Sequence, residues 1–124
     1  MTTPAPTYAE YKGSSGLAGG WALALKVNIH EQQKLAFGEA TINQAGVQGN
    51  PTYSFSVSGP VITMATMTTV HYGLRLASPA MPGRHIDVNA VLNQEWKAGE
   101  AIVNAWLDTP GGVICFHVKL EKIA

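Results

Sequence analysis

Cys115 and His117 come nearest in this sequence to a catalytic pair. They lie two positions apart in a β-type run, so both side chains point to the same face of a strand. A thiol beside an imidazole base is the arrangement of a cysteine nucleophile. Same-face neighbours on one strand are about 6.6 Å apart, however, which is too far for a direct hydrogen bond. We therefore expect an inert thiol, and a hydrolase that uses Cys115 and His117 is the weaker alternative.

The histidines and carboxylates form no recognisable metal or catalytic motif. No two histidines have His-x-His or His-x3-His spacing, so no converging set of metal ligands is expected. Glu95 and Glu100 flank Trp96, but a sugar-cleaving pair requires both carboxylates to project into one cleft. The sequence therefore predicts a protein that is not an enzyme and that has no metal and no cofactor.

Two tryptophans are the best markers of a binding function. Trp106 falls on a mixed face of the last predicted hairpin, together with Asn104, His117 and Lys119. An apolar ring with polar neighbours is typical of surfaces that bind a glycan, a peptide or another subunit. We predict that these four residues and Trp96 contact a protein or glycan partner. The alternative is that Trp106 packs between two overlapping sheets.

These residues belong to a hairpin near the C-terminal end of the sequence. Thr109-Pro-Gly-Gly112 is a turn sequence, because proline presets one corner and glycine accepts a positive φ at the next. The register that this turn sets pairs Ala105 with Phe116 and makes one face wholly apolar. The same register places Trp106 beside Cys115 on the other face.

Alternation of apolar and polar residues predicts six further strands. They cover 21–29, 35–43, 53–58, 61–69, 70–76 and 86–92. In the first strand, Trp21 points with the apolar row and is expected in the core. In the second, Phe37 has the opposite parity to its small apolar neighbours, which a bulge near Gly38 would reconcile. Pairing Leu76 with Ile86 sets Arg75 opposite Asp87.

Eight short strands, turn signals about every ten residues and no helical spacing indicate the all-β class. We predict a β-sandwich of about eight antiparallel strands, with a small up-and-down β-barrel as the alternative. Residues 1–20 are rich in proline, glycine and small polar residues, and they are predicted to form a disordered N-terminal arm. Residues 21–124 then form a single domain.

Composition restricts the partners. Eight basic and eight acidic residues give a formal net charge of zero without a basic stripe, so nucleic acid is not expected to bind. No apolar stretch approaches the roughly 20 residues of a membrane-spanning helix, and residues 1–15 lack the features of a signal peptide. A cytoplasmic location is the default, and export without a cleaved signal stays open.

A single cysteine excludes an internal disulfide. The low charge permits either a monomer or a homo-oligomer.

Several segments also suggest a relationship to a known family. They are Val27-Asn28, Gly38 to Ala45, Asn50-Pro51 with Ser58-Gly59, and Trp96 to Ala101. Together they resemble the bacterial domain-of-unknown-function family 1842 over most of the chain after Gly20. The chain departs from the family at 49–51, where a proline-rich run is expected. The resemblance implies a small β domain and no catalytic residues, since the family has no assigned activity.

A second likeness concerns the topology alone. Gly-Gly-Trp21 at the start of a strand, a run of hairpins and Trp106 look like the up-and-down barrels of the avidin type, which hold a small ligand. The ligand-binding residues of that type have no counterparts here. The sequence as a whole predicts a non-enzymatic binding or assembly module for a protein or glycan partner. A small ligand-binding barrel is the alternative, beside the hydrolase described above.

Overall fold

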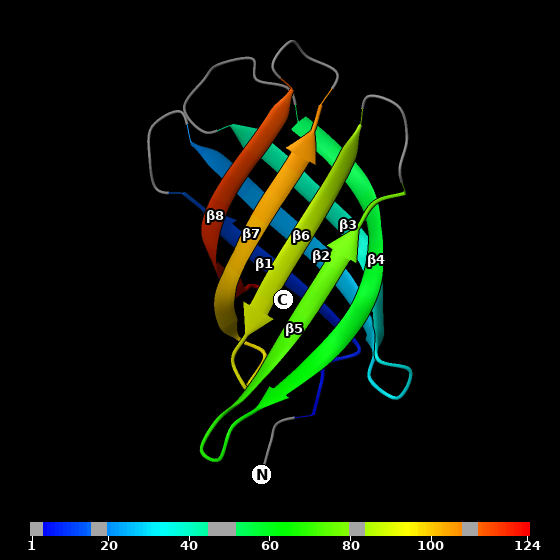
Figure 1. Cartoon of the computed structure of the whole chain (residues 1–124), viewed down its shortest axis with the longest axis vertical. Coiled ribbons are helices and arrows are strands. Elements are labelled where there is room, and N and C mark those ends of the chain that lie inside the picture. The colour runs from blue at the N-terminus through cyan, green and yellow to red at the C-terminus, as the bar shows by residue number, and fades with distance from the viewer. Residues whose placement is uncertain (1–3, 16–19, 45–51, 80–83, 108–111) are drawn as a thin grey trace.

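The computed structural model describes residues 4–15, 20–44, 52–79, 84–107 and 112–124. In these ranges the chain forms eight antiparallel strands that close into a barrel in the order of the sequence, so that β8 pairs with β1 (Figure 1). The strands are β1 (Tyr8–Ser14), β2 (Trp21–His30), β3 (Leu35–Gln44), β4 (Thr52–Ala65), β5 (Val70–Ala77), β6 (His85–Leu92), β7 (Ala98–Trp106) and β8 (Val113–Lys122). No helix in the described ranges has the length and apolarity needed to cross a membrane.

The predicted sandwich is wrong, whereas the all-β antiparallel class is confirmed. The decisive strand is β1, which lies within the stretch 1–20 that was predicted to be a disordered arm. It pairs with β2 from Tyr8 opposite Asn28 to Ser14 opposite Ala22, and with β8 through Tyr11 and Lys12. Every strand therefore has a neighbour on each side. The inward side chains form one enclosed core instead of the space between two sheets.

The two runs predicted as separate strands at 53–58 and 61–69 contain one long strand, β4. It continues through Gly59 and Pro60, where its ladder to β5 is interrupted between the pairs Ser58–Ala77 and Val61–Leu74. Proline cannot donate a ladder hydrogen bond, so the interruption falls where the sequence requires it. The sequence also predicts eight strands, but only because two errors cancel: the prediction divides β4 into two strands and omits β1.

Alternation of side chains builds the core from all eight strands. The β2–β3 ladder runs unbroken from the Trp21–Gln44 pair to the His30–Leu35 pair, so no bulge is needed near Gly38. Phe37 simply lies on the outer face, 43% exposed. Trp21 was predicted to be core but is only half-buried against it. The small inward residues of β3 lie opposite the bulky inward row of β2, which lets the two strands curve around one interior.

Two predicted registers are shifted by two residues. Ala105 pairs with Ile114 instead of Phe116, and Leu76 pairs with Val88 instead of Ile86. Arg75 consequently lies opposite Asn89, not Asp87. In the last hairpin the Leu107 N–H donates to the Gly112 carbonyl oxygen at 2.7 Å, so the connection is longer than the turn that was assumed. A shift of two preserves which residues share a face.

The two ends of the barrel differ. We call the end at which β2, β4, β6 and β8 begin the upper end, and the other the lower end (top and bottom in Figure 1). At the lower end Trp96, between β6 and β7, stacks on Tyr72 with ring centroids 4.2 Å apart. The Tyr11 hydroxyl donates to the Trp96 carbonyl oxygen at 2.7 Å. These three aromatic residues are buried and seal the lower end.

The buried phenol of Tyr11 predicts that the protein loses stability at alkaline pH. Burial raises the pKa of Tyr11 above its ordinary value of 10.0. The folded state therefore holds this proton more tightly than the unfolded state. The contribution of the protonated Tyr11 to the free energy of unfolding is complete below the pKa that this tyrosine has in the unfolded chain. It is lost as the pH rises above that value. Urea denaturation at about pH 9 and about pH 11 should show a larger loss of unfolding free energy for the wild type than for Tyr11→Phe. Equal losses in the two proteins would contradict this role of Tyr11.

Candidate functional site

Four of the predicted site residues lie on the outer face of β7 and β8. Trp106 is 38% exposed, and a barrel has no second sheet to cover it, so the alternative of packing between sheets does not apply. Lys119 is six residues beyond Val113, the residue opposite Trp106, and is therefore about 20 Å away along the strand. His117 lies near Glu100, with Nε2 and Oε2 3.6 Å apart. Trp106 and Asn104 are close, whereas His117 and Lys119 belong to a different part of the face.

Trp96, the fifth predicted residue, is 1% exposed at the sealed lower end. It has a positive φ of 64°, which a bulky residue adopts only when its surroundings impose it. Its ring packs on Tyr72 and contacts the core. The structure thus assigns Trp96 to packing and keeps it away from any surface that a partner reaches.

A group of side chains around Trp106 forms what we call the outer rim site: Trp106, His85, Asp87 and Asn104. His85 pairs with Trp106 across β6 and β7, and their ring centroids are 5.2 Å apart. Its Nε2 is 3.1 Å from Asp87 Oδ1, and Asp87 lies opposite Asn104. The indole plate is therefore bordered by an imidazole, a carboxylate and an amide on one patch of surface.

Hydrogen bonds hold His85 in place on both sides of its ring. Its Nδ1 is 3.1 Å from Ser78 Oγ, and that oxygen also accepts the Ile86 N–H at 2.9 Å. In the tautomer with its proton on Nε2, His85 donates to Asp87 and accepts from Ser78. Fixing the imidazole also fixes the ring against which Trp106 rests. The outer rim site is therefore preorganised.

The chain of Ser78, His85 and Asp87 contains the residue types of a hydrolytic triad. A serine nucleophile must reach its substrate, but Ser78 is only 9% exposed and its oxygen is engaged by a backbone amide. Cys115 lies opposite Asn104, so the predicted pairing with Trp106 does not occur. Among the described residues no three metal-ligating side chains gather. We interpret Ser78 as a positioning residue for His85.

A hollow of about 350 Å³ adjoins the outer rim site on the β5 side. Asp87 lines it together with Arg75, Asn89 and Pro60. It lies where the β4–β5 ladder is interrupted at Gly59 and Pro60. Asp87 thus belongs both to the hollow and to the rim of the indole plate. A polar surface continues from Trp106 across β6.

On the inner side of the same end lies what we call the inner aromatic cluster: Trp21, Tyr53 and Phe116. The Trp21 ring centroid is 6.4 Å from that of Tyr53 and 6.2 Å from that of Phe116. All three rings pack against the core and are half-buried. The Arg84 guanidinium lies 5.4 Å from the Tyr53 ring centroid and equally far from that of Phe55.

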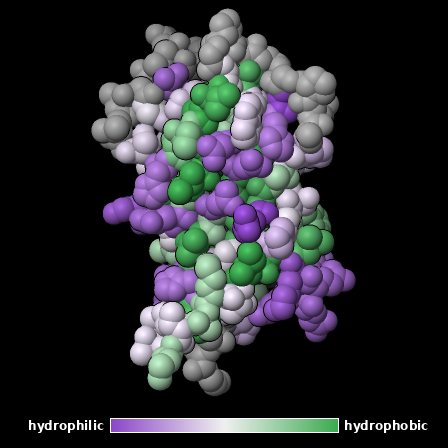
Figure 2. All heavy atoms as spheres, viewed as in Figure 1, coloured by the Kyte–Doolittle hydropathy of each residue, from purple (hydrophilic) through white to green (hydrophobic). Residues whose placement is uncertain are grey.

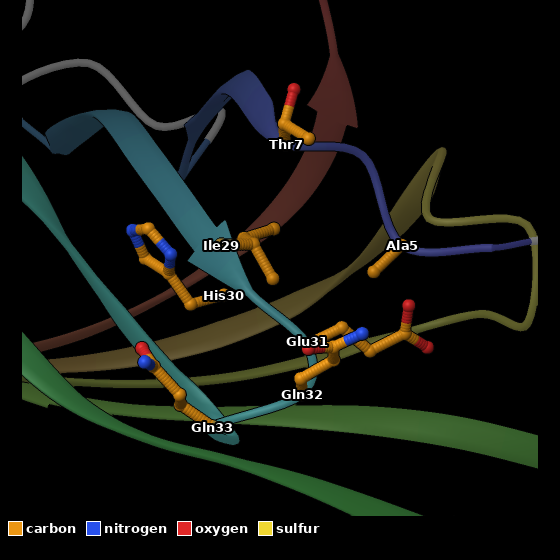
Figure 3. A pocket seen from close by; sticks show the side chains of 7 residues that line it. All are labelled: Ala5, Thr7, Ile29, His30, Glu31, Gln32 and Gln33. Atoms are coloured by element: carbon orange, nitrogen blue, oxygen red, sulfur yellow. The ribbon is translucent and has the colours of Figure 1, made fainter.

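A third region is a cleft of about 300 Å³ at the lower end, between the segment before β1 and the β2–β3 turn. The Ile29 N–H donates to the Thr7 carbonyl oxygen at 2.9 Å and fixes this segment. His30, Glu31 and Gln33 line the cleft, but their polar groups point in different directions (Figure 3). His30 also stacks on Phe37, at 5.2 Å between ring centroids. The cleft offers no converging set of groups to a ligand.

A comparison with protein families matches most of the barrel to one family. Residues 8–105 match the family described as a domain of unknown function, DUF1842. The chain belongs to this family. The resemblance noted from the sequence is confirmed, and the match begins at β1, which the sequence reading left outside the domain. It ends before β8, the strand that closes the barrel. No curated protein matches the chain.

Sequence reasoning missed three functional candidates of this DUF1842 domain: His85, Asp87 and Arg84. His85 and Asp87 are two apart on a strand, which indicates one face, but only the β6–β7 register brings them to Trp106. Arg84 has the parity of the inward residue Ile86, a signal that a charged group lies on the inner side of the strand start. Its aromatic neighbours come from β4, two strands away. Sequence spacing alone does not reveal that contact.

Proposed function

We propose that this DUF1842 domain is a non-enzymatic binding module that recognises a glycan at the outer rim site. The observation that carries the proposal is the exposed Trp106 ring, held by His85 and bordered by Asp87 and Asn104. The apolar face of a sugar ring stacks on an indole, while its hydroxyl groups bond to carboxylate and amide side chains. The non-enzymatic character is supported by the engaged hydroxyl of Ser78. It is also supported by the spacing of Cys115 and His117, same-face neighbours on β8 that lie about 6.6 Å apart along the strand, too far for a direct hydrogen bond.

A glycan fits this surface better than a protein does. The exposed apolar residues of the β6–β8 face are separated by polar ones, and Figure 2 shows the two kinds interspersed. Ile102 lies between Asn89 and His117, and Val91 lies opposite Glu100. Single exposed apolar side chains of this kind are normal on a protein surface, whereas a stable protein interface needs a contiguous apolar centre. On the described part of this face, Trp106 and Val113 opposite it form a local apolar plate.

The charges indicate which glycans to expect. Asp87 supplies carboxylate oxygens, which accept hydrogen bonds from sugar hydroxyl or ammonium groups and repel acidic sugars. The adjoining hollow, lined by Arg75 and Asn89, provides space and polar groups for a second sugar unit. For the sugar unit that stacks on Trp106 beside Asp87, we therefore expect a neutral or amino sugar to be preferred over a uronic acid.

Replacing Trp106 with Ala should weaken saccharide binding at least tenfold without unfolding the domain. A buried aromatic anchor is typically worth 2 kcal/mol or more in binding, which is more than a factor of ten, whereas an exposed ring adds little to the core. The measurement is a titration of the ¹⁵N-labelled protein with oligosaccharides of glucose, galactose and N-acetylglucosamine, and of galacturonic acid. The indole N–H resonance of Trp106 reports binding at this site.

Two variants serve as controls. Trp106→Phe keeps a ring and should retain most of the affinity. Ile102→Ala removes another exposed apolar side chain from the outer face of β7, outside the site, and should change affinity less than about twofold. Retention of saccharide binding by Trp106→Ala would place the glycan elsewhere. If none of the saccharides moved the Trp106 resonance, the glycan role would be refuted and a protein partner would be favoured for this surface.

A further inference from the structure

We propose that the upper end of the barrel carries a second, independent binding site, in which Arg84 and the inner aromatic cluster take a small planar carboxylate. This site lies inside the barrel wall, whereas the outer rim site lies outside it. The two meet at the start of β6, where Arg84 and His85 are consecutive residues that face opposite sides. The proposal does not depend on glycan recognition.

The two ends of the barrel use aromatic residues in contrasting ways. At the lower end Trp96, Tyr72 and Tyr11 are fully packed, and the phenol of Tyr11 has a hydrogen-bond acceptor. At the upper end Trp21, Tyr53 and Phe116 rest on the core but remain half-buried. The Trp21 ring lies 6.4 Å from that of Tyr53 and 6.2 Å from that of Phe116, centroid to centroid, so the three rings form one cluster at this end. These rings offer faces that a flat ligand covers.

Arg84 supplies the charge for such a ligand. An arginine guanidinium is positively charged and presents a planar fork of donors that matches a carboxylate. Among the described residues no ion pair involves Arg84. Its contacts are instead the rings of Tyr53 and Phe55, 5.4 Å from each centroid. A cation held over two rings, with no carboxylate partner among the described residues, favours a ligand that combines an anionic group with an apolar ring.

The core below the cluster limits the size of the ligand. Leu23, Ile42 and Ile86, the next inward residues of β2, β3 and β6, are at most 1% exposed. A long alkyl chain that entered the barrel would have to displace these side chains from a close-packed interior. A planar ring that lies on the cluster requires no such displacement. The geometry therefore selects an aromatic acid over a fatty acid.

The test uses indole-3-acetate as the probe, with indole as its uncharged counterpart and dodecanoate as the long-chain acid. In the ¹⁵N-labelled full chain, indole-3-acetate should shift the Trp21 indole resonance and leave those of Trp106 and Trp96 in place. Indole should bind more weakly because it lacks the carboxylate. Calorimetry should give an affinity loss of roughly tenfold to a hundredfold for Arg84→Gln, the range expected for a charged hydrogen-bonded pair.

The chain contains one other arginine, which provides a matched control. Arg75 is exposed on the outer face of β5, so Arg75→Gln should change the affinity for indole-3-acetate less than about twofold. An unchanged affinity in Arg84→Gln would overturn the role of Arg84, and a shift of Trp106 instead of Trp21 would place the acid at the outer rim. Absence of any shift at Trp21, or tighter binding of dodecanoate, would refute the proposed site. Loss of the Trp21 site would leave the saccharide proposal standing, because binding at Trp106 is titrated separately with neutral oligosaccharides.

Discussion

Replacing Trp96 with Ala is expected to lower the free energy of unfolding by about 3–5 kcal/mol, the usual cost of removing a buried tryptophan. The side chain is 1% exposed, and its ring stacks on Tyr72 across the lower end of the barrel. Its loss leaves a cavity that the surrounding strands, fixed by continuous ladders, do not close. Urea denaturation at neutral pH, followed by far-UV circular dichroism, measures the change.

The backbone of Trp96 makes this prediction sharper. At a normal position glycine is less stable than alanine by about 0.5–1 kcal/mol. Trp96 has φ 64°, where a residue with a Cβ is strained by roughly 1–2 kcal/mol and glycine is not. Trp96→Gly should therefore be more stable than Trp96→Ala, although both remove the same ring. The reverse order would show that the positive φ is not required in solution.

Trp106→Ala is the matched control for the buried ring. It also removes an indole, but from an exposed position on the outer wall, and should cost less than about 1 kcal/mol. Equal losses for the two tryptophan variants would contradict the division of roles between a sealing residue and a binding residue. Residue type alone does not distinguish these two tryptophans, because Trp96 precedes and Trp106 ends the same β-type run.

The strands were predictable where one face is exposed to solvent and the other is buried. Alternation identified β2 and both strands of the last hairpin with the right faces, because side chains of a strand point to opposite sides in turn. Their partners were less predictable. A shift of two residues in the register leaves every side chain on the same face of the sheet, so the apolar pattern is compatible with either pairing. Only the length of the connecting segment decides between the two registers.

Closure of the barrel was not predictable from the same pattern. Strand β1 carries only Ala9 and Tyr11 as buried residues, set among glycine and polar residues that are typical of a flexible arm. Its place is determined by its partners, β2 on one side and β8 on the other. Strands β2 to β8 would show the same alternation of apolar and polar residues in a sandwich as they do in the barrel. The difference lies in one short strand whose own apolar content is low.

The candidate sites depend on that closure. Trp106 lies on an outer wall because the sheet curves back on itself, and Arg84 reaches the rings of Tyr53 and Phe55 across the interior of the same curve. Sequence reasoning selected Trp106 and Asn104 from residue type and parity. It did not find His85 or Arg84, because their partners come from other strands. Long-range pairing is the information that one sequence lacks.

Tight curvature also predicts that Gly38→Ala destabilises the barrel by about 3 kcal/mol, at the upper end of the range for overpacking. Gly38 faces inward on β3, and a Cβ added there would lie 1.9 Å from the Lys26 carbonyl oxygen and 2.9 Å from the Val27 Cα. Both are backbone atoms of β2, held in an unbroken ladder, so they do not yield as a flexible side chain would. The φ of Gly38 is outside the left-handed region, so the cost is steric alone.

Gly73 on β5 is the matched control, because it is also a glycine inside a strand that pairs with a neighbour on each side. A Cβ there would meet the flexible end of the Met64 side chain at 3.3 Å, and would make ordinary contacts with Ile62 Cβ at 3.7 Å and the Ala90 carbonyl oxygen at 3.9 Å. Gly73→Ala should change stability little or raise it by about 0.4–1 kcal/mol, since alanine restricts the unfolded chain more than glycine does. Opposite signs for the two variants in urea denaturation would support glycine as a requirement of close strand approach. If Gly38→Ala were as stable as Gly73→Ala, β3 would not approach β2 so closely, and the barrel would be wider at this point.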